Sequence, residues 1–588
     1  MLLATAGAAL AVTVVSPDGQ VRVQFDLKPS TGPVYSVTHH GKPVVLESKL
    51  AFATTASRIT AVKENRHAGE WKPLYAERSS IPDNWSEAVV TLDTGLAITL
   101  RAYNEGAAFR YTFASPTTIT GERTEFRLPQ ATRAWETHGA QQQYENVWTS
   151  SLKPNVERPL VIEYPDGRLA AFAEAGLRDY SRMQFSPVDG QPNTLYTQLF
   201  DEKVTGVTTT PWRAIIVADR PGDLIERNYL LLNLCPPPVA GDYSWIRPGK
   251  VIREVTLSTK GAKEAVDFAA ARGLRYIEFD AGWYGHEYED ASDATGVHVD
   301  PLRLQKDPAY QGLDLPEVIA YGKQKGIGVW LYVNRRALEK QLPTLLPLYE
   351  KWGVKGVKYG FVNVGSQQWT KWLYDAVELA GKHHLMVDIH DEHRPTGLSR
   401  TYPWLLTQEG ILGNEGMPPS DHNTVLPFTR FVAGAADYTI CYYVDRVKTT
   451  RAHQLAIAVV YYSPLQFMYW YDRPSDWKSE PETEFFDRVP TTWDDTKVVQ
   501  GEIGRYITTA RRSGNDWFVG TLNNGVPRRL TVPLTFLPAG RRFLAHIYEN
   551  GRGGSKDVKM STQEVDATSV IPVQLPPAGG QAIWLEAR

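Results

Sequence analysis

The feature that most constrains the fold is a regular alternation of helical and apolar extended segments in the middle of the chain. Helical patterns are predicted at 262–272, 315–325, 342–352 and 369–382, and each precedes an apolar strand, predicted at 274–280, 327–333, 356–362 and 385–390. Strands separated by helices pair in parallel, and the pattern runs over roughly 240 residues, which favours a closed (β/α)8 barrel. A doubly wound open sheet is the alternative, but no G-x-G-x-x-G motif follows the first strand.

The flanking regions have the pattern of antiparallel β-structure. Residues 21–27 alternate between apolar and polar, and the strands predicted at 89–92 and 96–100 flank the turn signal Asp93-Thr94-Gly95. These patterns predict a large N-terminal antiparallel β-sandwich and a small C-terminal antiparallel β domain. With Cys235-Pro236-Pro237-Pro238 as a linker, the predicted domains are those at 12–240, 241–490 and 491–588.

The first residues predict export. Residues 1–11 are apolar and rich in small side chains, and Ala9-Leu10-Ala11 resembles a signal-peptidase site, although a basic n-region is missing. We therefore expect 1–11 to be the remnant of a secretory signal and the protein to be periplasmic or secreted. No apolar run reaches 18 residues, so no membrane span is predicted.

Composition narrows the class of protein. The net charge of -3 offers no basic surplus for nucleic acid. The two cysteines, Cys235 and Cys441, exclude a disulfide scaffold or a CxxC zinc site and favour two buried thiols over one long-range disulfide. The 17 Trp and 29 Tyr residues suit either stacking on sugar rings or packing in β domains.

Candidate catalytic residues follow the predicted barrel strands, where barrel enzymes carry their active sites. Four carboxylates fall between Asp391 and Glu415 at the ends of two successive strands. Such a cluster can bind a hard cation such as Ca²⁺ through oxygen, or supply the acid and base of glycoside hydrolysis. A metal-dependent lyase or aldolase with a barrel fold stays open on spacing alone.

Several segments then resemble glycoside hydrolase family 97 over most of the chain. They are Ser16-Pro17-Asp18-Gly19, Trp245-Ile246-Arg247-Pro248-Gly249-Lys250, His390-Asp391-Glu392-His393-Arg394-Pro395-Thr396-Gly397, Glu409-Gly410, Leu426-Pro427-Phe428-Thr429-Arg430 and Ser463-Pro464-Leu465-Gln466. The resemblance implies an N-terminal β-supersandwich, a (β/α)8 barrel and a C-terminal β domain, which matches the division deduced from the patterns. It also implies a calcium-dependent, exo-acting glycosidase on α-glucosides or α-galactosides of oligosaccharides. The alternatives are another sugar, such as a β-L-arabinopyranoside, and a sugar-binding homologue without catalysis. The oligomeric state is left open.

The resemblance also implies roles for individual residues. Glu415 matches the general acid, and either Asp391 or Glu392 occupies the place of the base. The implied Ca²⁺ ligands are Glu174, Glu409, Glu415 and Asp391, and the implied sugar contacts are Lys358 and His390. Two further substrate-binding candidates lie at the barrel rim: Asp280, and Trp283, which suits stacking or packing equally.

The mechanism expected from the sequence is inversion. Retaining members of the family carry an aspartate nucleophile where this chain has Gly360. Known inverting members carry a further glutamate at the end of the preceding strand, where this chain has Asn334-Arg335. Inversion requires only a water between base and sugar, so a carboxylate at Asp391 or Glu392 suits it better than direct attack.

Overall fold

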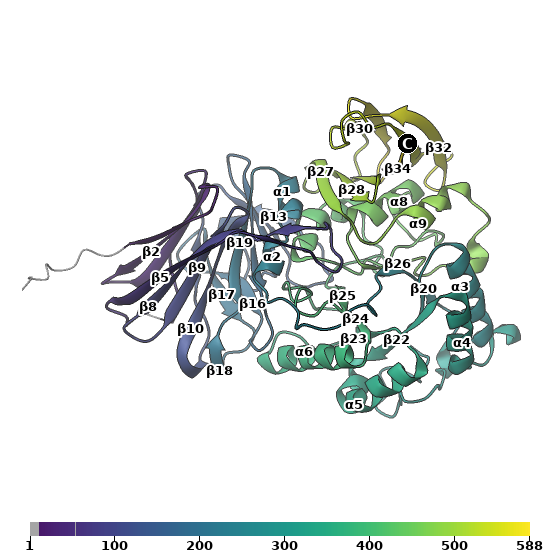
Figure 1. The fold of residues 1–588 in the computed structure, drawn as a ribbon, viewed down its shortest axis with the longest axis horizontal. Helices are drawn as coiled ribbons and strands as arrows, with labels where there is room; N and C mark the ends of the chain where they lie inside the picture. Colours follow the sequence, from purple (N-terminus) through teal and green to yellow (C-terminus); the bar gives the residue numbers. More distant parts are fainter. Residues whose placement is uncertain (1–10, 53–54) are drawn as a thin grey trace, which may run out of the picture.

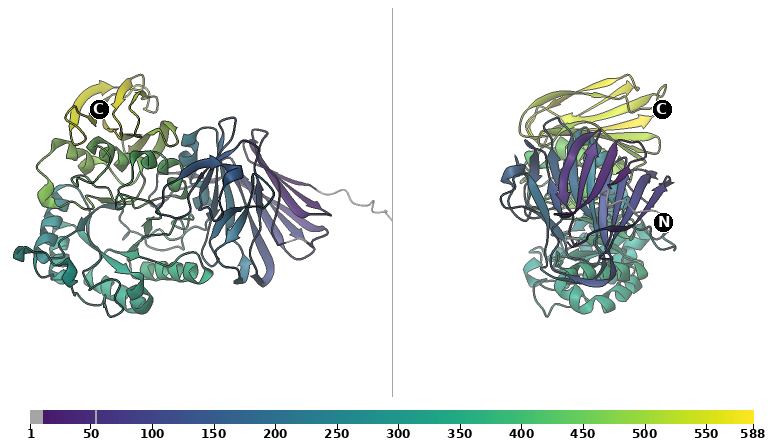
Figure 2. Two further views of the ribbon diagram at one scale, coloured as in Figure 1. Left: turned by 180° about the vertical axis from the view of Figure 1, so that it is seen from behind. Right: turned by 90° about the vertical axis from the view of Figure 1, so that its left-hand side faces the viewer.

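The computed structural model describes residues 11–52 and 55–588, so positions 1–10 of the predicted leader lie outside the described residues. Figure 1 shows three parts: a β-sandwich, a barrel beside it, and a smaller C-terminal β domain above the barrel. In the two further views of Figure 2, the sandwich and the C-terminal domain again lie against different sides of the barrel. Over the described ranges, no helix is both long and apolar enough to cross a membrane.

The N-terminal part is built from two large antiparallel sheets that enclose one core. The first sheet contains, in spatial order, β1 (Val12–Val15), β2 (Val21–Lys28), β3 (Gly32–His39), β4 (Lys42–Lys49), β11 (Glu125–Arg127), β17 (Thr194–Leu199) and β16 (Met183–Pro187). The second contains β13 (Glu145–Trp148), β12 (Arg133–Glu136), β14 (Leu160–Glu163), β15 (Leu169–Ala175), β19 (Trp212–Ala218), β10 (Gly106–Ile119), β9 (Ala97–Tyr103), β8 (Trp85–Leu92) and β5 (Ile59–His67), with β18 (Val204–Thr209) paired to β10.

The predicted alternation and hairpin are confirmed. In β2 the side chains of Val21, Val23 and Phe25 are buried and those between them are exposed, because successive side chains of a strand point to opposite faces. Strands β8 and β9 pair antiparallel across the predicted turn, where Gly95 has a φ of 82°.

The barrel contains seven parallel strands, and a segment without regular strand structure takes the eighth place. In spatial order the strands are β25 (Leu405–Gln408), β24 (Met386–Ile389), β23 (Gly356–Gly360), β22 (Gly328–Asn334), β21 (Tyr276–Phe279), β20 (Gly249–Glu254) and β26 (Leu465–Met468). Between β25 and β26, Asp437 N donates to Gln408 O at 3.4 Å and Ile440 N donates to Phe467 O at 3.0 Å. The sheet is therefore nearly closed, as the (β/α)8 prediction requires.

Helices lie outside the barrel strands (Figure 1). They are α3 (Thr259–Ala271), α4 (Leu315–Lys325), α5 (Arg335–Trp352), α6 (Gln367–Lys382), α7 (Ser420–Asn423), α8 (Arg451–Val460) and α9 (Glu484–Arg488). Side chains of Ser258, Asp314, Asn334 and Ser366 cap the first four of these helices, which fixes where each begins. Helix α5 is longer than predicted and tolerates Pro343 and Pro347, since both lie on its exposed face.

The C-terminal domain packs on the barrel through α8. Its main sheet contains β27 (Asp495–Glu502), β28 (Tyr506–Ser513), β29 (Asp516–Asn523), β34 (Gly580–Ala587), β31 (Phe543–Asn550) and β32 (Val558–Val565), and β30 (Arg528–Pro533) pairs with β33 (Val570–Leu575). In α8, the His453 imidazole lies 3.0 Å from Gly579 O through Nδ1 and 3.2 Å from Asn423 Nδ2 through Nε2. The hydroxyl of Tyr438 donates to Asn423 Oδ1 at 2.7 Å, so this chain of polar groups joins the two domains.

The sandwich is joined to both other parts. Between β5 and β8 the chain makes an excursion that carries the short strands β6 (Glu70–Trp71) and β7 (Ile81–Pro82). Within it, Glu77 accepts a 2.9 Å bond from Arg511 of the C-terminal domain. The helices α1 (Pro221–Glu226) and α2 (Leu230–Asn233) follow the sandwich.

The two cysteines agree with the prediction of two buried thiols. Cys235, which follows α2, and Cys441 are both free and buried.

Candidate active site

The inward-facing side chains of four neighbouring strands form a charged interior that rises to the carboxyl ends of the strands. Pairing sets Tyr332 of β22 beside Lys358 of β23, and Lys358 beside Asp388 of β24. One layer nearer the mouth, Asn334 and Gly360 end β22 and β23, and His390 directly follows β24. Because functional groups of barrel enzymes project from this end, this is the candidate active site.

Lys358 is the cation at the centre of this interior. Its side chain is 1% exposed, and Nζ lies 3.2 Å from Asp280 Oδ2 and 4.0 Å from the centre of the Trp470 ring. Burial alone would lower the pKa of Lys358, but Asp280 and Glu278 raise it above its usual value. Burial would likewise raise the pKa of Asp280, but Lys358 and Arg253 lower it well below its usual range. The structure thus brings the predicted residues Lys358 and Asp280 together as an ion pair.

His390 lies between two carboxylates. Its Nδ1 is 3.2 Å from Glu409 Oε2 and its Nε2 is 3.1 Å from Asp437 Oδ2. Burial alone would lower the pKa of His390, but Glu409 and Asp437 raise it well above its usual value. A protonated imidazole can donate from both nitrogens, so His390 fixes the orientation of Glu409.

Glu409 also links the barrel to the sandwich. Its Oε2 accepts bonds from Asp391 N at 2.6 Å and from Gln141 Nε2 at 2.9 Å, and Gln141 belongs to the N-terminal part. Glu409 is 2% exposed, so these donors replace water around its carboxylate.

Glu415 differs from its neighbours because its carboxylate is free. The loop that carries it is anchored by Asn414, whose N donates to Tyr438 O and whose Nδ2 donates to Gln454 Oε1 at 2.8 Å. One ligand atom each from His390, Glu409 and Glu415 lie within 4.8 Å of one another. Among the described residues none forms a hydrogen bond to the Glu415 carboxylate, which is half-buried and so can meet a ligand at the mouth.

Two carboxyl groups deeper in the barrel have a raised pKa. Burial raises the pKa of Glu278 well above its usual value, and Asp280 beside it raises it further. Burial and Asp437 likewise raise the pKa of Asp388, which is fully buried. Neither group is placed to act on a ligand at the mouth.

The structure corrects the prediction for Trp283. Its side chain is 0% exposed, and its indole N–H donates to Tyr332 O at 2.8 Å while its ring packs on Tyr284. Trp283 therefore belongs to the packed core, and a sugar has no access to either face of its ring.

Glu174 also lies apart from the predicted calcium cluster. It sits in β15, fully buried, and its oxygens accept bonds from Arg213 Nη1 at 2.8 Å and Arg158 Nε at 3.1 Å. Two arginines already balance its charge, and Glu174 is not one of the three residues, His390, Glu409 and Glu415, whose ligand atoms lie within 4.8 Å of one another.

The two candidates for the base differ in exposure. Asp391 has a φ of 68°, and its Oδ2 accepts a bond from Phe361 N, directly after Gly360. Glu392 is exposed, and its Oε2 accepts a 3.0 Å bond from Ala140 N of the sandwich. Asp391 thus points into the mouth beside Gly360, whereas Glu392 closes the mouth against the N-terminal part.

Sequence reasoning missed several polar residues of the mouth. The structure adds Arg253 from β20, Glu287 from the loop after β21, Asp437 from the eighth barrel segment and Gln141 from the sandwich. Asp437 had no signal, because its segment lacks a strand pattern. Gln141 and Glu287 lie in loops whose reach cannot be inferred from local sequence.

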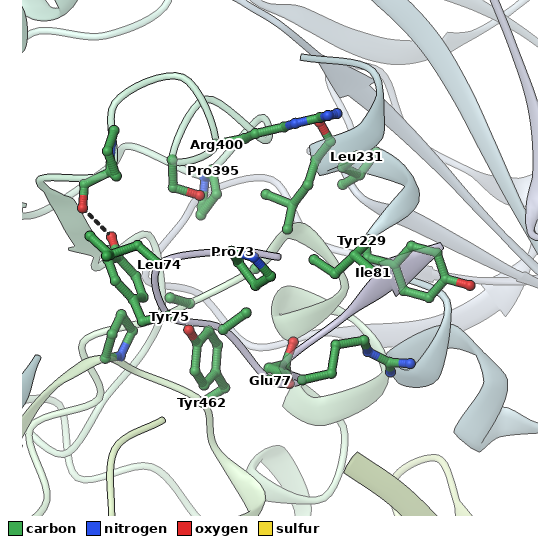
Figure 3. Close-up of a pocket in the computed structure, with 18 of the residues that line it drawn as sticks. Pro73, Leu74, Tyr75, Glu77, Ile81, Tyr229, Leu231, Pro395, Arg400 and Tyr462 are labelled. Atoms are coloured by element: carbon green, nitrogen blue, oxygen red, sulfur yellow. Dashed lines mark hydrogen bonds between the residues drawn. The ribbon is translucent and has the colours of Figure 1, made fainter. Parts of the chain in front are cut away.

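Two of the cavities beside the barrel bear on the position of the site. One of about 280 Å³ opens beside Arg253 and Asp280 and is covered by Leu302–Gln305. Another of about 310 Å³ lies where the excursion between β5 and β8 packs on the barrel wall (Figure 3). There Leu74, Tyr75 and Tyr462 surround the space, and the Tyr75 hydroxyl donates to Pro403 O at 2.6 Å. None of the predicted site residues lines this second cavity, whereas Asp280 lines the first.

Three protein-family models match successive parts of the chain. The model described as glycosyl-hydrolase 97 N-terminal matches residues 14–237, that of glycoside hydrolase 97 matches 247–411, and that of glycosyl-hydrolase 97 C-terminal, oligomerisation, matches 492–586. The chain belongs to glycoside hydrolase family 97. As a family 97 protein it is a glycoside hydrolase, and the resemblance deduced from the sequence is confirmed.

Relatives of the family 97 chain are similar over nearly their full length. A retaining α-galactosidase from Bacteroides thetaiotaomicron is 28% identical over 98% of this chain and 96% of its own. A probable retaining α-galactosidase from Streptomyces bingchenggensis is 30% identical over 88% of this chain and 83% of its own. Both names state retention, which contradicts the inversion expected from the sequence.

Solved structures of family 97 agree with the fold. A family 97 enzyme from Pseudoalteromonas sp., in complex with acarbose, superposes with a TM-score of 0.89 at 27% identity over 98% of this chain and all of that one. A β-arabinopyranosidase shares the fold at 21% identity with a TM-score of 0.83. The barrel with its two flanking β domains is therefore the family architecture.

Proposed function

We propose that this family 97 protein is an exo-acting α-galactosidase in which Glu415 is the general acid. The observation that carries the proposal is the free Glu415 carboxylate at the barrel mouth, above a buried interior that contains Lys358 and His390. A half-buried carboxyl group that accepts no hydrogen bond from the described residues can carry a proton and deliver it to the glycosidic oxygen as that bond breaks. The α-galactoside is taken from the names of the two relatives.

The neighbouring charged groups suit a terminal sugar. Asp280 and Lys358 are fixed by each other, so their remaining donor and acceptor capacity can orient hydroxyl groups. The loop at Ala140, bonded to Glu392, closes one side of the mouth, which favours the end of a sugar chain over its middle.

We propose Ca²⁺ as the cofactor, held by Glu409 and Glu415 with Asp391 beside them. Carboxylate oxygens are the ligands that Ca²⁺ prefers, and the free Glu415 side chain leaves capacity for a cation. When bound, the ion would offset the repulsion of the crowded carboxylates and polarise a sugar oxygen. His390 is already engaged by two carboxylates, so we assign it to positioning rather than to the ion.

Ca²⁺ binding predicts a change in stability as well as in activity. Adding Ca²⁺ to chelator-treated protein should raise its melting temperature, because a ligand that binds the folded state stabilises it. The Glu409→Gln variant should lose this rise. An equal rise in both proteins would place the ion elsewhere.

The names of the relatives favour retention, so we propose a double displacement in place of inversion. The test is hydrolysis of matched nitrophenyl α-galactoside, α-glucoside and β-L-arabinopyranoside, with proton NMR of the first sugar released. We expect the α-galactoside to be cleaved at least tenfold faster than the others and to give α-galactose first. Preference for another glycoside would change the sugar assigned. Binding without cleavage of any glycoside would indicate a sugar-binding homologue.

A further inference from the structure

Two aromatic side chains of β22 occupy space that side chains of β23 would need. A Cβ at Gly356 would lie 2.5 Å from the indole of Trp330, and a Cβ at Gly360 would lie 2.2 Å from the hydroxyl oxygen of Tyr332. A side chain at either position would therefore collide with the aromatic ring beside it, so both positions need glycine. As a result, the Tyr332 hydroxyl stands where a side chain at position 360 would project.

The Tyr332 hydroxyl has a base beside it. It donates to Glu287 Oε2 at 2.5 Å, and Asn334 Nδ2 donates to the same carboxylate oxygen at 3.1 Å. Glu287 is half-buried, whereas Tyr332 is 4% exposed, so Glu287 is the more solvent-accessible residue of the pair. A hydroxyl within hydrogen-bond reach of a base that a third group orients is the arrangement of an activated nucleophile.

Electrostatics agree with this arrangement. Burial raises the pKa of Tyr332 well above its usual value, and the Glu287 carboxylate raises it further. The phenol is therefore protonated at neutral pH and can attack only if a base accepts its proton in the same step. Glu287 is that base by position.

We propose that Tyr332 is the nucleophile of the double displacement and Glu287 its general base, an inference that rests on the proposed function. Glu415 comes from the loop after β25, three strands from β22 in the sheet, so acid and nucleophile approach the sugar from different sides. Tyrosine nucleophiles occur in some glycosidases, so the chemistry has precedent.

The two steps balance. In the first, Tyr332 Oη forms a bond to the anomeric carbon and passes its proton to Glu287, while the glycosidic C–O bond breaks and the leaving oxygen takes the proton of Glu415. In the second, water attacks the anomeric carbon and gives a proton to Glu415, the bond to Tyr332 breaks, and Tyr332 regains its proton from Glu287. Two displacements at one carbon give net retention.

The test compares Tyr332→Phe with Tyr359→Phe as a matched control. Tyr359 lies in β23, is also buried, and its hydroxyl reaches Ala376 O at 3.3 Å, away from the mouth. Tyr332→Phe keeps the ring that fills the space at Gly360, so we expect an unchanged melting temperature and a loss in kcat of a thousandfold or more. We expect Tyr359→Phe to stay within about threefold of the native rate. Adding Glu287→Gln to Tyr332→Phe should cost little more, because residues that act as a unit are not additive.

The covalent intermediate gives the decisive readout. After incubation with a 5-fluoro-α-galactosyl fluoride, peptide mapping should find the sugar on Tyr332, and Tyr332→Phe should remain unlabelled. A label on Glu287 or Asp391, or β-galactose as the first product, would overturn Tyr332 as nucleophile while leaving the α-galactosidase activity standing. Failure to cleave any α-galactoside would instead refute the proposed function.

Discussion

At the scale of single residues, Glu415 is distinguished by the absence of hydrogen bonds to its carboxylate from the described residues around it. If it is the general acid, Glu415→Gln should reduce cleavage of substrates with poor leaving groups by a thousandfold or more. Activated aryl galactosides should lose far less, since their leaving group needs little protonation. Steady-state kinetics on raffinose and on dinitrophenyl galactoside would measure this, and equal losses on both would contradict the assignment.

Lys358 is the residue whose loss should harm both stability and binding. Lys358→Met leaves the buried Asp280 carboxylate with Arg253 as its remaining cationic partner, at 3.6 Å. Breaking a buried ion pair costs about 3–5 kcal/mol, so we expect a clear fall in the free energy of unfolding and loss of activity. The exposed Lys355→Met is the matched control and should leave both unchanged. Urea unfolding of both variants would test the difference.

At the scale of elements, the polar chain through His453 predicts a dependence of stability on pH. Burial lowers the pKa of His453 from 6.5 to about 4. The unfolded chain therefore binds a proton in that window before the folded protein does, and the free energy of unfolding falls as the pH drops from 6.5 to 4. The shift corresponds to about 3 kcal/mol.

The His453→Gln variant removes this titration while it can keep one donor and one acceptor toward Gly579 and Asn423. Its unfolding free energy should decline less between pH 6.5 and 4 than that of the native protein. His67→Gln, at an exposed histidine, should follow the native curve. Identical slopes for all three proteins would show that another group controls the acid sensitivity.

Elements with local signals were predictable and those defined by distant partners were not. Helix α4 has its predicted bounds because Asp314 caps its start and Gly326, at a φ of 75°, ends it. The eighth barrel segment could not be predicted because its sequence has no strand pattern. Its position is set by backbone hydrogen bonds to Gln408 on one side and Phe467 on the other. Glu415 and Glu409 could be predicted from motifs, but the burial of Trp283 and the arginine partners of Glu174 depend on packing across elements.

At the scale of the whole molecule, the candidate active site includes a residue of the sandwich. Gln141 donates to Glu409, so the N-terminal part helps to orient a proposed ligand of Ca²⁺. Gln141→Ala should reduce kcat by about tenfold without changing the fold of the barrel, because one hydrogen bond to a charged group is worth roughly 1.5–3 kcal/mol. Its exposed neighbour gives the control Gln142→Ala, and equal rates for the two variants would exclude this role.

The fit of Tyr332 against Gly360 also has an evolutionary consequence. The two positions lie on adjacent strands and share one volume, so neither can change freely while the other is kept. A relative that gains a side chain at the position of Gly360 must replace the aromatic ring on the neighbouring strand or turn it aside. The pair should therefore covary across the family, and a lineage that exchanges one kind of nucleophile for another has to pass through both substitutions together.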